Sequence, residues 1–102
     1  MGAYESQPPT CITLQPQGQL AYVDQTLTLS VVAVSPLALS YQWQLNGTNI
    51  AAATNSTLVF TNVQLADAGT YNVVISNSAQ IITSSKAPLT VVYTPLVILA
   101  QP

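Results

Sequence analysis

Apolar and polar residues alternate along several short segments of this chain, which is the pattern of half-buried β-strands. In residues 26–34 an aliphatic or Ala side chain recurs at every odd position, so one face of this strand is predicted to be buried. In residues 41–45 aromatic or aliphatic residues alternate with Gln, which places Trp43 in the predicted core. The Asn46-Gly47 pair that follows tolerates positive φ and predicts a tight hairpin turn.

The same period of two continues in the second half of the chain. Residues 57–61 read as a strand with Leu58 and Phe60 facing inward. Residues 70–76 read as a further strand, whose inward side chains include Tyr71 and Val73.

A last strand is predicted over about residues 81–93. Pro88 lies within it, and because Pro has no N–H, this predicts either an edge strand or a bulge. Short strands at this spacing, without any helical period, predict an all-β antiparallel sandwich.

The composition excludes several classes of function. The chain has 102 residues, which is room for one domain, and only 4% of them are charged. One Lys and three scattered acids form no basic patch for phosphates, so we expect no nucleic-acid partner. No stretch approaches the roughly 20 consecutive apolar residues that cross a bilayer, so we expect no membrane insertion. The first residues do not resemble a secretion signal, and we expect any such signal to lie outside this sequence.

The segment Asp67-Ala68-Gly69-Thr70-Tyr71 carries the most specific motif, DxGxY, and is followed by Val73 where the motif usually continues to Cys. Together with Trp43 and Asn77, this motif resembles the I-set immunoglobulin-like family over residues 9–92. The pattern without Cys, including the run YQWQLNG and the turn SNSA, is similar to bacterial immunoglobulin-like repeats of large secreted or cell-surface proteins.

The resemblance implies an immunoglobulin-like Greek-key sandwich of about seven to eight strands. Val31 and Val73 stand at the two positions where the family has its Cys pair, so they would meet across the sheets under Trp43. The Tyr71 hydroxyl would bond to backbone a few residues upstream. The residues assigned in this way to the structural core are Val31, Trp43, Leu58, Phe60, Asp67, Gly69, Tyr71 and Val73.

The chemistry for catalysis is sparse. There is no His, so Ser-His-Asp and Cys-His arrangements cannot be assembled. Asp24 and Asp67 are the candidate carboxylate pair, but the resemblance puts them at different turns, and we expect Asp67 to cap the turn before Tyr71. No Asp-rich loop suits calcium. We therefore expect no enzyme activity, no cofactor and no metal site.

Lys86 is the candidate for an intramolecular isopeptide bond, which would need it buried beside an Asn and a carboxylate. The simpler interpretation is a solvated charge that discourages unwanted strand pairing.

Two octets near the ends of the chain share the pattern Pro-x-x-Ile-x-x-Gln-Pro, and Pro95 lies 86 residues after Pro9. We interpret residues 1–8 as an extension, 9–93 as the domain, and 94–102 as a linker or donor strand that resembles the start of another repeat. A tail that merely frays is the alternative. The residues predicted to take part in assembly are Cys11, Ile12, Val97, Ile98 and Leu99.

The solitary Cys11 aligns with Val97 in the second octet, so an apolar role is the simplest interpretation. An intermolecular disulfide and a lipid attachment are the alternatives.

These patterns favour a non-catalytic structural or assembly module of a secreted or cell-surface protein. It would act as a tandem-repeat spacer, or as a fibre subunit that self-assembles through its terminal strands. The expected partners are copies of itself or neighbouring immunoglobulin-like repeats. A glycan and a protein are both possible ligands. The alternative function is a carbohydrate-binding or adhesion accessory module of a secreted multidomain enzyme.

Overall fold

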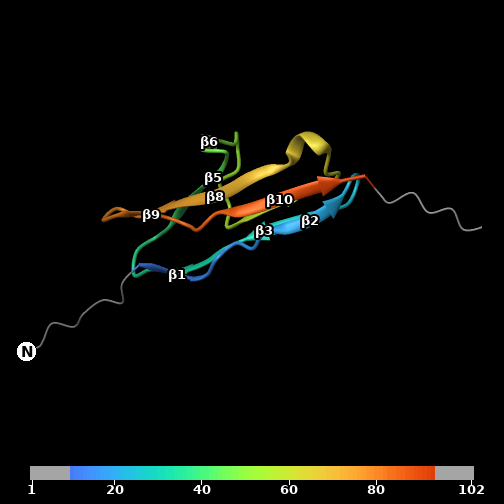
Figure 1. The fold of residues 1–102 in the computed structure, drawn as a ribbon. Coiled ribbons are helices and arrows are strands. Elements are labelled where there is room, and N and C mark those ends of the chain that lie inside the picture. The colour runs from blue at the N-terminus through green and yellow to red at the C-terminus, as the bar shows by residue number, and fades with distance from the viewer. Residues whose placement is uncertain (1–9, 94–102) are drawn as a thin grey trace, which may run out of the picture.

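The computed structural model describes residues 10–93 of the chain. This part folds into short β-strands and one turn of 3-10 helix (Figure 1). In chain order the elements are β1 (Cys11–Leu14), β2 (Gln19–Tyr22), β3 (Leu27–Ser30), β4 (Val32–Val34), β5 (Ser40–Leu45), β6 (Thr48–Asn49), β7 (Thr57–Phe60), η1 (Leu65–Asp67), β8 (Gly69–Ser76), β9 (Ile81–Thr83) and β10 (Ala87–Val92).

The strands form two layers. The larger sheet has the order β2-β10-β8-β5-β6, and β9 also pairs with β8. The second layer contains the pairs β1–β4 and β3–β7, and only Val31 separates β3 from β4. Within residues 10–93 every strand pair is antiparallel except β2–β10, which is parallel. The predicted all-β sandwich is therefore confirmed, with one parallel pair that the sequence pattern did not predict.

The chain changes layers between its first two strands. β1 pairs with β4 in the second layer, whereas β2 lies beside β10 in the larger sheet. The crossing is made by residues 15–18, in which Pro16 is buried. The first extended segment thus contributes to both layers of the sandwich.

The core lies between the layers and is filled by side chains from both. Trp43, from the larger sheet, is fully buried, and its indole Nε1 donates to the backbone oxygen of Asn55 at 2.8 Å. Leu29, from the second layer, belongs to the same cluster. The largest fully buried side chains are Trp43, Tyr71, Leu29, Ile75, Val63 and Val73.

The predicted single strand over residues 26–34 is interrupted at Val31. The N–H of Val31 donates to the backbone oxygen of Ser56 at 3.1 Å, outside the β3–β7 register. Val31 is nevertheless buried, so the predicted inward face is kept across the break. The predicted hairpin turn is also present, with φ of 51° at Asn46 and 86° at Gly47 between β5 and β6.

The predicted last strand over residues 81–93 is wrong as one element, because the chain forms β9 and β10 with a break between them. At the break the Val73 N–H donates to the Ser84 hydroxyl oxygen at 2.9 Å, so a side chain takes the place of a backbone acceptor. Of the two alternatives expected from Pro88, the edge position is wrong, since β10 lies between β8 and β2. The bulge is present just before Pro88, because residues 84–86 oppose only residues 72–73 between the pairs Thr83–Val74 and Ala87–Tyr71. Pro88 is tolerated where it opposes Thr70 of β8 and pairing with β2 begins only at Leu89.

Candidate functional site

The DxGxY segment forms a tyrosine corner between η1 and β8. The Tyr71 hydroxyl donates to the backbone oxygen of Asp67, four residues upstream. The Asp67 carboxylate accepts the N–H of Gln64 at 2.8 Å and so caps the 3-10 turn. Burial, reinforced by the charge of Asp67, raises the pKa of Tyr71 to about 12. The corner therefore fixes the approach to β8 by hydrogen bonds at both ends of the turn.

Gly69 suits this corner through its conformation, and an added side chain there would displace the end of Leu45. Its φ is +156°, and a Cβ there would lie 2.6 Å from Cδ1 of Leu45. Asn46 holds the next residue of β8, since its backbone N–H donates to the Thr70 oxygen at 2.8 Å and its side-chain oxygen accepts the Thr70 N–H at 3.0 Å. The β5–β6 turn and the corner are thus locked together.

The other residues expected in the core have two degrees of burial. Val31 and Val73 are both buried and belong to one cluster with Trp43, one Val from each layer. Leu58 and Phe60 are half-buried and pack against that cluster. The Phe60 ring meets Tyr71 edge to face, with centroids 5.5 Å apart.

The two candidate acids lie at different turns but meet at one end of the sandwich. Asp24 accepts a hydrogen bond from Nε2 of Gln64 at 2.9 Å, while Asp67 binds the backbone N–H of the same residue. Gln64 therefore links the two carboxylates. Asp24 and Gln64 are 40 residues apart in the sequence, so no local pattern predicts their hydrogen bond. In residues 10–93 no group of three or more His, Cys, Asp or Glu is placed to hold a metal ion.

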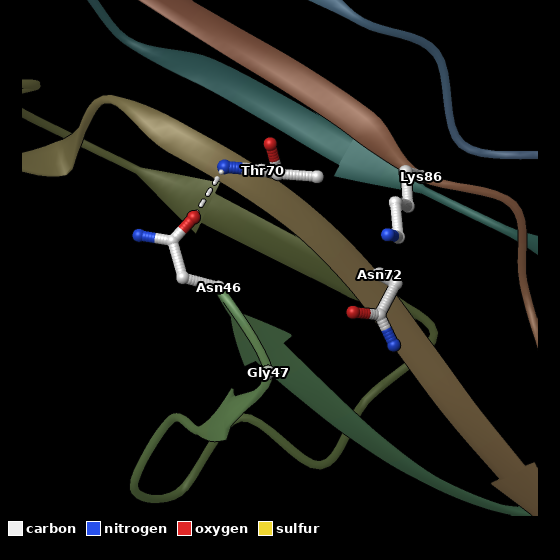
Figure 2. Close-up of a pocket in the computed structure, with 5 residues that line it drawn as sticks. All are labelled: Asn46, Gly47, Thr70, Asn72 and Lys86. Atoms are coloured by element: carbon white, nitrogen blue, oxygen red, sulfur yellow. Dashed lines mark hydrogen bonds between the residues drawn. The ribbon is translucent and has the colours of Figure 1, made fainter.

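A polar hollow of about 380 Å³ lies on the outer face of the larger sheet (Figure 2). Its lining residues are Asn46, Gly47, Thr70, Asn72 and Lys86. Lys86 is exposed and no carboxylate lines the hollow, so the environment of an isopeptide bond is not met here. No aromatic side chain lines it either, and it offers no stacking surface for a sugar ring.

Three residues of the first octet anchor this segment to the rest of the domain. Ile12 pairs with Ala33 and packs against the core, and Pro16 is buried. The Gln15 side-chain oxygen accepts the N–H of Ser85 at 2.9 Å. Cys11, by contrast, is exposed with a free thiol. The remaining predicted assembly residues, Val97, Ile98 and Leu99, lie outside the described residues.

Asn77 holds together the end of the sandwich at which β1 begins. Its Nδ2 donates to the hydroxyls of Thr10 and Ser35, each at 2.9 Å. Its Oδ1 accepts the N–H groups of Ala79 and Gln80 at 2.8 and 2.9 Å. The family resemblance singled out Asn77, but the partners Thr10 and Ser35 are 67 and 42 residues away and were not foreseen.

No helix in residues 10–93 has the length and apolar character needed to span a membrane.

Solved structures of several other proteins share this fold. The tandem Ig repeats of Dlar match with a TM-score of 0.77 and 22% identity, over 83% of this chain and 49% of that one. Extracellular domains 3–5 of Drosophila OTK match with a TM-score of 0.70 and 22% identity, over 80% of this chain and 31% of that one. Titin M4 matches with a TM-score of 0.73 and 23% identity, over 85% of this chain and 99% of that one.

The chain spans about half or less of the first two of these structures, and at these identities they show the fold alone. No curated protein sequence matches significantly. The family model described as "Immunoglobulin domain" matches residues 8–77, which is more than half of the chain. The protein therefore belongs to the immunoglobulin domain family.

Proposed function

We propose that this domain is a non-catalytic repeat unit of a secreted or cell-surface protein, where it acts as a spacer or fibre subunit through its terminal strands. The bacterial, Cys-free type of repeat and the I-set subtype are part of this proposal and rest on the sequence resemblance. Its surface suits such a role, because a net charge of −2 produces little repulsion between copies.

The observation that carries the proposal is which residues of the first octet make contacts within the domain. Of the positions that it shares with the second octet, Ile12, Gln15 and Pro16 are described, and each makes a contact inside the domain. Four described positions differ between the two octets. Cys11, Thr13 and Leu14 are exposed, whereas Thr10 is half-buried and its hydroxyl accepts a hydrogen bond from Asn77 Nδ2 at 2.9 Å. The pattern thus repeats three residues that make contacts in the fold, and three of the four positions that vary are exposed.

The second octet supplies the same set of side chains 86 residues later. Ile98, Gln101 and Pro102 correspond to Ile12, Gln15 and Pro16. A segment with these residues can fill the β1 position of a following copy, either in the same polypeptide or in another subunit. The domain boundaries proposed above, 9–93 and 94–102, rest on the same correspondence.

The comparisons support a modular setting. The similar structures include the tandem Ig repeats of Dlar and extracellular domains 3–5 of Drosophila OTK, and this chain covers one part of each. An extracellular location and neighbouring immunoglobulin-like repeats are proposed for this chain by analogy.

A two-copy protein tests whether the second octet can serve as a first strand. Residues 1–102 are joined directly to residues 17–93, so that residues 95–102 stand where 9–16 stand at home. We expect the second copy to unfold in urea close to the midpoint of a reference protein in which 1–94 is joined to 9–93. A variant with Ile98→Ser and Gln101→Ala should unfold at a lower concentration. The proposal fails if the native octet performs no better than this variant.

Size-exclusion chromatography of the 102-residue chain, with and without residues 94–102, separates the two forms of assembly. Oligomers that disappear on truncation indicate exchange of the tail between subunits. A monomer at all concentrations leaves tandem repetition as the surviving form.

A further inference from the structure

The two ends of the sandwich are built from different loops, and the chain enters at one and leaves at the other (Figure 1). The carboxyl pole comprises Tyr93, the β2–β3 turn and residues 61–68, which are joined by the bonds Val23 N–H to Val92 O (2.8 Å) and Asp24 N–H to Val63 O (2.7 Å). The amino pole comprises Thr10, residues 35–39 and residues 77–81, which meet at Asn77.

Each pole exposes large hydrophobic side chains. Among the described residues, the two most exposed large hydrophobics are Tyr93 at the carboxyl pole and Ile81 at the amino pole, both 70% exposed. Leu65 (42%) lies at the carboxyl pole with Tyr93, and Leu37 (43%) lies at the amino pole with Ile81. Such side chains cost free energy in water and gain it when another surface covers them.

The spacing between copies brings these poles together. In the proposed array, position 97 takes the place of Cys11, the first residue of β1, so only residues 93–96 separate β10 from the next β1. Five residue steps span at most roughly 17 Å even when fully extended. Pro95 stiffens this short connection further. So short a link keeps the carboxyl pole of one copy close to the amino pole of the next.

We infer that the carboxyl pole of each copy packs on the amino pole of the next, with Tyr93 and Leu65 of one covering Ile81 and Leu37 of the other. The inference rests on the proposed tandem arrangement and names its partner, a second copy of this domain. The array is then a stiff rod whose neighbouring units have a fixed orientation.

Charge does not oppose this contact. Asp24 and Asp67 both lie at the carboxyl pole, whereas residues 35–39 and 77–81 of the amino pole include no charged side chain. In the proposed contact, Asp24 and Asp67 of one copy therefore meet uncharged side chains of the next copy rather than like charges. The hydrogen bonds of Asn77 already hold the amino pole in shape, which lowers the ordering cost of docking.

The test uses the reference protein in which residues 1–94 precede residues 9–93, because both copies then keep their native first octet and the link has the same length. Residual dipolar couplings report the alignment of each copy separately. We expect the two copies to share one alignment tensor. Tyr93→Ser in the first copy, or Ile81→Ser in the second, should loosen the orientation of one copy relative to the other. The magnitudes of the alignment tensors of the two copies should then differ by about twofold or more.

The same substitutions at the free poles are matched controls. Tyr93→Ser in the second copy and Ile81→Ser in the first should leave the shared tensor intact. The inference is overturned if the unsubstituted copies already align independently, or if junction and free-pole variants behave alike. This outcome is distinct from failure of the proposed function, which depends on whether the second octet folds as a first strand.

Discussion

Tyr71→Phe removes one hydroxyl from a ring that is otherwise kept, so it isolates the hydrogen bond of the tyrosine corner. Tyr71 is 1% exposed, and its hydroxyl donates to the backbone oxygen of Asp67. Phe fits the same volume and preserves the edge contact with Phe60. What is lost is the bond itself and the partner of the Asp67 carbonyl.

The magnitude follows from those two losses. A hydrogen bond within a protein contributes about 0.5–1.5 kcal/mol net, and a carbonyl left without a partner raises the cost toward about 2 kcal/mol. For a domain of this size each kcal/mol corresponds to roughly 4–8 °C in the unfolding temperature. We therefore expect Tyr71→Phe to lower the free energy of unfolding by about 1–2 kcal/mol.

The pH dependence provides a second readout of the same group. The pKa of Tyr71 rises from 10.0 to about 12 on folding, mainly through burial. Below pH 10 the phenol is neutral in both states and nothing is lost. Between pH 10 and 12 the unfolded chain releases the proton while the folded chain retains it, so stability falls as pH rises. Each pKa unit corresponds to about 1.4 kcal/mol, and the loss approaches about 3 kcal/mol above pH 12.

Urea unfolding followed by fluorescence measures both effects, because Trp43 is the chain's one Trp and is fully buried. Tyr41→Phe is the matched control, since the Tyr41 ring is half-buried and its hydroxyl donates no hydrogen bond within residues 10–93. The reasoning is refuted if Tyr71→Phe leaves the midpoint unchanged, or if the variant loses as much stability as the unsubstituted protein between pH 10 and 12.

Three further substitutions test other parts of the framework. Gly69→Ala should cost about 3 kcal/mol through strain and overlap, whereas Gly47→Ala, with φ of +86° and no atom within 4 Å of the added Cβ, should cost about 1 kcal/mol; equal midpoints in urea would contradict this. Val31→Cys combined with Val73→Cys should close a disulfide on oxidation and add about 1–3 kcal/mol; thiol titration that finds every thiol free would show that the two positions do not face each other. Asn77→Asp keeps an acceptor but loses two donors, so it should cost about 1–2 kcal/mol and speed amide exchange in β1; unchanged exchange there would argue against its role as a tie.

The sequence was sufficient to predict the inward faces of the strands, because side chains alternate with a period of two wherever one face is buried. Trp43, Val31 and Val73 were placed in this way and all three are buried. The Asn46-Gly47 turn was equally accessible, since positive φ at two successive residues has a strong residue preference.

Features that depend on strand order were not accessible from local patterns. Pro88 indicated an edge strand or a bulge, and the choice between them depends on where β2 begins to pair, which is some 70 residues earlier in the chain. The break at Ser84 depends on one hydroxyl oxygen accepting the Val73 N–H. The hollow beside Lys86 also escaped prediction, because its lining comes from the β5–β6 turn, from β8 and from the segment before β10.

The absence of a disulfide changes how stability is distributed in such a protein. With one Cys in the sequence, no bridge can form within the chain, and a bridge of the usual kind contributes about 2–5 kcal/mol. Burying Val31 and Val73 contributes about 1.5–3 kcal/mol each, so packing can offset the missing covalent link in an isolated domain. In an array with touching poles, each interface adds a nearest-neighbour term to the stability of both copies. A copy inside the proposed rod should then unfold less readily than the same copy alone, and the contacts that stiffen the rod would also supply part of what sulfur supplies in other members of the family.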